Sequence, residues 1–252
     1  MRRGAAARPS YILMYGPGAG PDVGATGHGC CKVNLFRANS ERLRTKRLNF
    51  AGKTTLRMKK RLILEVPGGA TRVLLHTCCA PCSSAIIECM MQHGITPVIY
   101  YCNPNIFPAE EYRIRKDECT RYAQSLGLDI IDADYDHAAW LKGVAGMENE
   151  PERGARCLRC FTMRLADTAR YAAEHGFTVI TTTLMSSRWK SLDQINEAGR
   201  RAVAPYPDVA WWDHNWRKGG LNERRAAIIR EYGFYNQQYC GCEYSMRVKS
   251  EE

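Results

Sequence analysis

The sequence contains no uninterrupted apolar segment of the roughly 20 residues that a helix needs to cross a bilayer. The one early apolar run, from Tyr11 to Tyr15, is shorter than the hydrophobic core of a secretory signal peptide. No repeat with a period of roughly 20–50 residues is visible. These absences predict a cytoplasmic globular protein that does not enter a membrane.

Acidic residues are scarce at the start of the chain. Residues 1–69 hold 3 Asp and Glu against 14 Lys and Arg, whereas residues 70–252 hold 23 against 22. The formal net charge of +10 therefore comes from the amino-terminal part. Any RNA binding by the remainder must depend on local basic patches.

Residues 1–57 show no hydrophobic periodicity, and they combine Gly- and Pro-rich sequence with a basic run from Arg37 to Arg47. A basic RNA-binding arm and a disordered extension are both compatible with this composition. We favour a third interpretation, in which the true start is Met58. Residues 58–252 are then expected to form a single catalytic domain that folds and functions without the preceding residues.

From about residue 60, apolar runs alternate with amphipathic segments. Strands are predicted at 72–76, 96–101, 129–133 and 178–183, and helices at 83–93, 109–126 and 160–175. A glycine follows each helix, at Gly94, Gly127 and Gly176, where a left-handed residue ends a helix at least cost. Strands separated by helices run parallel, so we predict an open doubly wound α/β sheet with its ligand site at the carboxyl ends of the strands.

Seven of the 12 cysteines form three close groups, each where a strand ends or a helix begins, or near the carboxyl terminus. The groups are Cys78-Cys79-Ala80-Pro81-Cys82, Cys157-Leu158-Arg159-Cys160 and Cys240-Gly241-Cys242. In a reducing compartment such a number favours metal or redox chemistry over structural disulfides. Four thiolates suit zinc as well as an iron–sulfur cluster, and spacing alone leaves the two open.

The third group permits two interpretations. Gly241 allows a sharp bend that brings the two thiols together as a small, easily reduced disulfide ring. Alternatively, both cysteines are further metal ligands. Among the other cysteines, Cys89 and Cys119 are expected in the core and Cys102 is undecided, while Cys30 and Cys31 lie in the doubtful first segment.

The sequence resembles the QueH-type epoxyqueuosine reductases, a cobalamin-independent family, from about Arg61 to the end. The resemblance rests on these segments, in order: LLHTCCAPCSS (74–84), YYCNPNIFPAEEYRIRKDE (100–118), DADYDHAAW (132–140), GMENEPERGARCLRCF (146–161), SSRWKSLDQIN (186–196), WWDHNWRKGG (211–220) and YCGCEYS (239–245).

This resemblance implies an adenine-nucleotide α-hydrolase (PP-loop-like) fold and the reduction of epoxyqueuosine to queuosine at the wobble position of tRNA. It implies a [4Fe–4S] cluster on four cysteines and a redox-active pair, with a further cysteine available to a second iron. The implied cluster ligands are Cys78, Cys79, Cys157 and Cys160. The implied redox-active pair is Cys240 and Cys242, and Cys82 is the cysteine available to a second iron. The electron donor is left open.

The implied tRNAs carry a GUN anticodon, whose wobble base would be everted and gripped by aromatic and basic side chains. Candidates are Lys190, Trp216, Arg217 and Lys218, although tryptophans are also common core residues, and Asn103 and Asn105 are expected to line the pocket. Candidate proton donors, by proximity to the motifs alone, are His76, Lys190, Tyr239 and Tyr244.

Two rival functions fit less well. A PP-loop enzyme that adenylates tRNA would need a glycine-rich phosphate loop after the first strand, where this sequence has cysteines. A zinc-ribbon RNA-binding module would have no use for the Cys240-Gly241-Cys242 pair.

Overall fold

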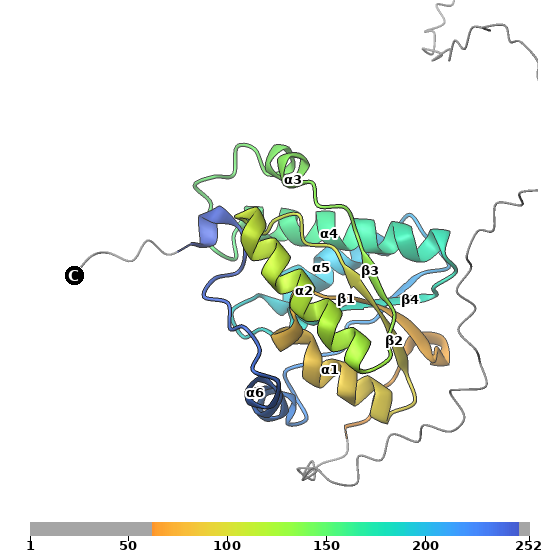
Figure 1. Ribbon diagram of the computed structural model, residues 1–252. Helices are drawn as coiled ribbons and strands as arrows, with labels where there is room; N and C mark the ends of the chain where they lie inside the picture. Colours follow the sequence, from red (N-terminus) through yellow and green to blue (C-terminus); the bar gives the residue numbers. More distant parts are fainter. Residues whose placement is uncertain (1–61, 247–252) are drawn as a thin grey trace, which may run out of the picture. The chain divides into compact units, whose positions relative to one another are not determined.

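A computed structural model describes residues 62–246 of the chain (Figure 1). The expectations for residues 1–57, including Cys30 and Cys31, and for a start at Met58 lie outside the described residues. The elements follow in the order η2 (Pro67–Gly69), β1 (Arg72–His76), α1 (Ala80–Gln92), β2 (Thr96–Tyr101), α2 (Ala109–Ser125), β3 (Ile130–Asp132), α3 (His137–Gly143), α4 (Ala155–Glu174), β4 (Val179–Thr182), η3 (Thr183–Ser186), α5 (Leu192–Val203), β5 (Ala210–Trp211), α6 (Leu221–Tyr232) and η4 (Glu243–Ser245).

The five strands form one open, all-parallel sheet in the order β3-β2-β1-β4-β5. Helices cover both faces: α1 packs with α2 and α6, and α4 packs with α5 on the opposite side (Figure 1). Val73, Leu74 and Leu75 in the central strand β1 are fully buried, as a strand covered on both faces requires. The predicted doubly wound α/β fold is confirmed.

The central strands match the sequence-based expectation, whereas two helices begin earlier than predicted. Helix α1 starts at Ala80 with Pro81 in its first turn, a position that suits proline because its missing N–H is not needed there. Helix α4 starts at Ala155, so Cys157 and Cys160 both lie within its first two turns. Gly94, Gly127 and Gly176 adopt φ of 75°, 70° and 71°, which confirms the predicted helix ends.

The topology creates a crevice between β1 and β4. The chain leaves β1 toward β2 on one side and returns to β4 on the other, so the two carboxyl ends diverge into different loops. Side chains link these ends: His76 Nδ1 lies 2.7 Å from Thr182 Oγ1, and the Cys78 amide donates to Thr183 Oγ1 at 3.2 Å. The turn that carries the first cysteine group is thereby fixed beside the end of β4.

The prediction that Trp216 contacts the substrate is wrong, because its side chain has 0% exposure. Its indole donates to Thr181 Oγ1 at 3.4 Å and packs edge-on against Trp212 in the core. Lys218, two residues later, is exposed. Within residues 62–246, no helix combines the length and apolar character needed to cross a membrane.

Replacing Trp216 with Ala should therefore lower the free energy of unfolding by about 3–5 kcal/mol, the usual cost of a large buried cavity. The exposed Lys218→Ala variant should change it by less than about 0.5 kcal/mol. Urea denaturation followed by circular dichroism measures both. Equal stability of the two variants would contradict the core position of Trp216.

Candidate functional site

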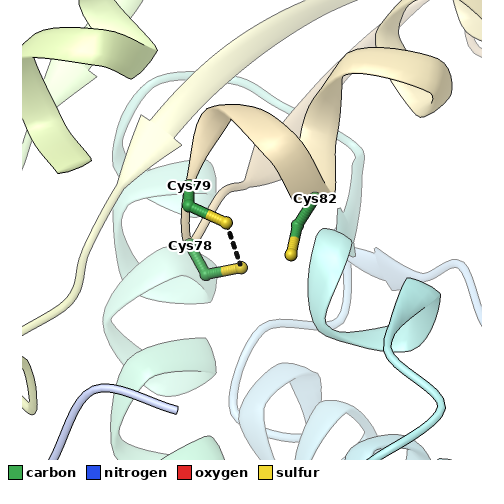
Figure 2. Close-up of side chains that lie close together, drawn as sticks. All are labelled: Cys78, Cys79 and Cys82. Carbon is green, nitrogen blue, oxygen red and sulfur yellow. Dashed lines mark hydrogen bonds between the residues drawn. The ribbon is translucent and has the colours of Figure 1, made fainter. Parts of the chain in front are cut away.

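Three cysteines meet where β1 leads into α1: Cys78 and Cys79 lie in the connecting turn, and Cys82 lies in the first turn of α1 (Figure 2). The Sγ atoms of Cys78, Cys79 and Cys82 all lie within 4.8 Å of one another, and those of Cys78 and Cys79 are 3.8 Å apart. Two sulfurs bound to one tetrahedral metal at about 2.3 Å each are separated by about 3.8 Å. The group therefore has the donor type and the spacing to hold a metal.

The pKa values of the three thiols are shifted in different directions. Hydrogen bonds from Cys79 and Cys82 hold the pKa of Cys78 well below its usual range, an effect that Lys190 supports and burial opposes. Burial raises the pKa of Cys79, and the neighbouring Cys78 raises that of Cys82. Metal binding requires deprotonated thiols, so a metal bound here would displace their protons.

All three cysteine groups contribute to one cavity of about 360 Å³ at the carboxyl edge of the sheet. Its lining includes Cys78, Cys82, Cys157, Cys240 and Cys242. Residues that are 164 positions apart in the sequence, Cys78 and Cys242, thus face one space. Cys160, by contrast, is buried behind this lining, packed with Trp140, and Cys242 packs against the same small cluster.

Two buried guanidinium groups hold the loops that shape the cavity. Arg164 donates to the Cys102 carbonyl at 3.2 Å and to Asn103 Oδ1, and the Asn103 amide donates to the Thr77 carbonyl at 2.9 Å. Arg115 pairs with Glu111 at 2.7 Å and donates to the carbonyls of Cys240 and Tyr239 at 3.1 and 3.3 Å. Neither arginine was singled out from the sequence.

Gly241 is tightly constrained between the two cysteines of the third group. Its φ of 141° favours glycine, and a β-carbon there would lie 3.0 Å from Asn105 Nδ2 and 3.1 Å from Ile106 Cγ1. Its carbonyl accepts a hydrogen bond of 2.8 Å from the Phe107 amide. Both flanking cysteines are free thiols in the structure, and burial raises the pKa of Cys242 to about 11.

Two further side chains reach the thiols. The Gln237 amide nitrogen lies 3.0 Å from Cys79 Sγ and donates to it, whereas no sequence pattern distinguished this glutamine. Lys190, a candidate proton donor and tRNA contact in the sequence, lines the cavity. Burial disfavours its charge, but the nearby thiols of Cys240, Cys78 and Cys82 outweigh this and raise its pKa.

Of the remaining substrate candidates, one lines the cavity and another supports a neighbouring loop. Asn105 lines the cavity, and its buried Oδ1 has no hydrogen-bond partner within residues 62–246. Arg217 donates to the carbonyls of Ser187 and Lys190, the latter at 2.6 Å, so it supports a loop.

The proton-donor candidates separate in the same way. His76 is fully buried, and burial, reinforced by Arg164, lowers its pKa to about 3, so it is neutral near pH 7. Tyr239 lines the cavity and donates its hydroxyl to the Phe107 carbonyl. Tyr244 lies outside the lining, with the Arg156 guanidinium 4.6 Å from its ring centroid.

An open doubly wound sheet with cysteines gathered at its switch point defines an α/β protein whose site has the thiol donors to hold a metal. The family model described as epoxyqueuosine reductase QueH matches residues 73–248. The chain therefore belongs to the epoxyqueuosine reductase QueH family, which is a family of oxidoreductases.

Relatives from several bacteria carry the same name, Epoxyqueuosine reductase QueH. The protein of Histophilus somni is 52% identical over 184 residues, which cover 73% of this chain and 76% of that protein. The protein of Acinetobacter baylyi is 48% identical over 189 residues, covering 75% and 87%. That of Thermotoga maritima is 31% identical over 183 residues, covering 71% and 93%.

Metal binding by the first cysteine group can be measured with the metal-free protein under anaerobic conditions. Cobalt(II) should give thiolate-to-metal absorption, and Cys79→Ser or Cys82→Ser should weaken this binding by more than about tenfold, because each removes a thiolate donor. Cys89→Ser is the matched control, since Cys89 lies buried in the same helix away from the three sulfurs. Equal cobalt affinity in all variants would contradict the site.

Proposed function

We propose that this protein reduces epoxyqueuosine to queuosine in tRNA, the last step of queuosine biosynthesis, with the thiol-lined cavity as its active site. The observation that carries this proposal is the convergence of all three cysteine groups on one cavity in a member of the epoxyqueuosine reductase family. The work would take place in the cytoplasm, on tRNAs with a GUN anticodon.

The reaction sets the chemical requirement. Conversion of an epoxide into an alkene and water consumes two electrons and two protons. A [4Fe–4S] cluster held by Cys78, Cys79, Cys157 and Cys160 would supply electrons one at a time. An iron bound at Cys82 would add a Lewis acid for the epoxide oxygen. The pair of thiols three residues apart at the start of α4 and the three clustered sulfurs beside β1 support this ligand set.

Cys240 and Cys242 match the stoichiometry of the reaction. Oxidation of two thiols to one disulfide releases two electrons and two protons, the amounts that the epoxide takes up. Cys240 is exposed, so an external reductant can reach it and restore the dithiol after each turnover. The φ of Gly241 supports the sharp bend that such a small ring needs.

Lys190 is the best-placed cation for the departing oxygen. It lines the cavity and interacts electrostatically with the thiols of Cys240, Cys78 and Cys82. Its ammonium group can donate a hydrogen bond to the oxygen as the carbon–oxygen bond breaks. Neutral, fully buried His76 is a poorer donor.

The charge of the lining supports a nucleic-acid substrate. Arg153, Lys190 and Arg225 line the cavity, together with the buried Arg115, Arg156 and Arg164, whereas Glu152 is the one acidic residue of the lining. Cations of this kind attract the phosphates that flank an everted base. The basic patch belongs to the folded domain, whose net charge is close to zero.

The cluster ligands can be tested by substitution. Cys157→Ala or Cys160→Ala should abolish the brown absorption and most of the bound iron of anaerobically purified protein. Cys119→Ala should keep both, because Cys119 is a buried core residue of α2. A wild-type preparation with stoichiometric zinc and no iron would favour a zinc-binding module instead.

The redox role of the third group has its own experiment. The Cys240→Ser/Cys242→Ser double variant should retain the wild-type iron content but lose multiple turnover, because it lacks the dithiol whose oxidation supplies two electrons. If the pair instead binds metal, iron per protein falls in the same variant. Full multiple-turnover activity of the double variant would contradict both roles.

A further inference from the structure

Trp189 stands apart from the other tryptophans of the chain. Its side chain is 61% exposed, whereas Trp140, Trp212 and Trp216 are buried and Trp211 is half-buried. It also belongs to the lining of the cavity, so its exposed ring lies at the mouth of the candidate active site. A large apolar ring exposed to solvent beside a cavity indicates a binding surface for a partner molecule.

The backbone around this exposed side chain is firmly held. Arg153 Nε donates to the Trp189 carbonyl at 2.8 Å, and Arg217 donates to the next carbonyl, that of Lys190, at 2.6 Å. The Trp189 amide donates to Ser187 Oγ at 3.3 Å. The ring is thus presented from a fixed backbone, which lowers the entropy lost when a partner stacks on it.

Arg153 connects this platform to the cysteines. It is the one residue other than glycine with positive φ, 69°, among residues 62–246, and such strained residues cluster at functional sites. Its amide donates to Cys157 Sγ at 3.3 Å, and its carbonyl accepts from Gln194 Nε2 at 2.6 Å. One residue therefore fixes the position of Trp189 relative to the second cysteine group.

The surroundings of the ring identify the kind of partner. The Arg188 guanidinium lies over one face of the Trp189 ring, with its central carbon 4.7 Å from the ring centre, so a base would stack on the opposite face. Arg153 and Lys190 also line the cavity. An aromatic face beside guanidinium groups is the combination that binds unpaired bases by stacking and their phosphates by charge. An electron-carrier protein would have to match the same aromatic and basic rim, and it is the alternative that the experiment distinguishes.

We propose that Trp189 is a stacking platform for a nucleotide next to the everted base, which holds the anticodon loop at the cavity mouth. This proposal rests on the proposed function and adds the residue that positions the RNA. Trp189 acts through the flanking nucleotide, so it should contribute to binding of the RNA and leave the chemical step unaltered.

The test uses the full-length, cluster-containing protein and an anticodon stem-loop RNA with a GUN anticodon. Stacking on Trp189 should quench part of the tryptophan fluorescence of the wild type. Trp189→Ala should bind the RNA about tenfold more weakly, and it should lack that quenching. Trp189→Phe, which keeps a ring, should recover most of the affinity. Ile114→Ala, an exposed apolar position on α2 outside the cavity lining, is the control and should bind like the wild type.

Kinetics with epoxyqueuosine-containing tRNA complete the test. Trp189→Ala should raise KM about tenfold with little change in kcat. Wild-type affinity for the RNA and wild-type KM in Trp189→Ala would overturn the platform. A raised KM for a protein reductant, with unchanged RNA affinity, would overturn it in favour of the electron carrier.

The two proposals fail in different ways. A wild-type protein that binds the stem-loop with quenching but does not reduce epoxyqueuosine refutes the proposed activity and leaves the platform standing. Circular dichroism of each variant shows whether it is folded, and Trp189→Leu offers a second non-aromatic variant if Trp189→Ala is not. Wild-type RNA affinity in Trp189→Leu would also overturn the platform.

Discussion

The pairing of β1 with β4 at the centre of the sheet determines the position of everything at the site. Parallel strands in contact must end at the same edge, and here one ends in a turn of cysteines and the other in η3. The Cys78–Thr183 and His76–Thr182 contacts then fix that turn against η3. Because both strands are buried, the cost of moving them is that of disrupting the core, so the thiols are held rigidly.

Buried charge is the second organising element of the site. The side chains of Arg115 and Arg164 are almost completely buried from solvent, and each donates hydrogen bonds to loop carbonyls rather than to a carboxylate alone. A guanidinium without such partners would be expensive to bury. Placed around thiols, these cations also favour thiolate charge, the form in which cysteine binds metals and transfers electrons. The same residues therefore shape the loops and set the electrostatic potential of the cavity.

Strong local patterns made the centre of the fold predictable. The strands at 72–76 and 96–101 and the glycines that follow the helices depend on nearby residues, and the structure reproduces them. Helices α3, α5 and α6 were missed, although α5 carries local signals: Ser191 accepts from the Gln194 amide at its start, and Arg200 and Arg201 lie in its last turn. In the candidate site, the spacing of the cysteine groups made them predictable from the sequence. The roles of Gln237, Arg115 and Arg164 could not be predicted, because they depend on partners more than 60 residues away.

The tryptophan-rich segment at 211–218 shows how composition misleads at a binding site. Its aromatic and basic residues resemble an RNA-binding strip, yet Trp212 and Trp216 fill the core and Arg217 supports a loop. Sequence composition does not reveal which side of a segment faces water when no clear periodicity is present. The exposed ring instead occurs at Trp189, in a segment with the same kinds of residues.

The two sides of the cavity are made at different times during protein synthesis. Cys79 precedes its hydrogen-bond partner Gln237 by 158 residues, and Cys240 and Cys242 come later still. At about 5–20 residues per second a ribosome needs roughly 8–30 s to add that length. During this interval the nascent chain carries Cys78, Cys79 and Cys82 without the segment that later covers them. The thiols consequently lack the Gln237 contact until the chain is nearly complete, so a metal or an oxidant that meets the nascent chain finds them without that neighbour.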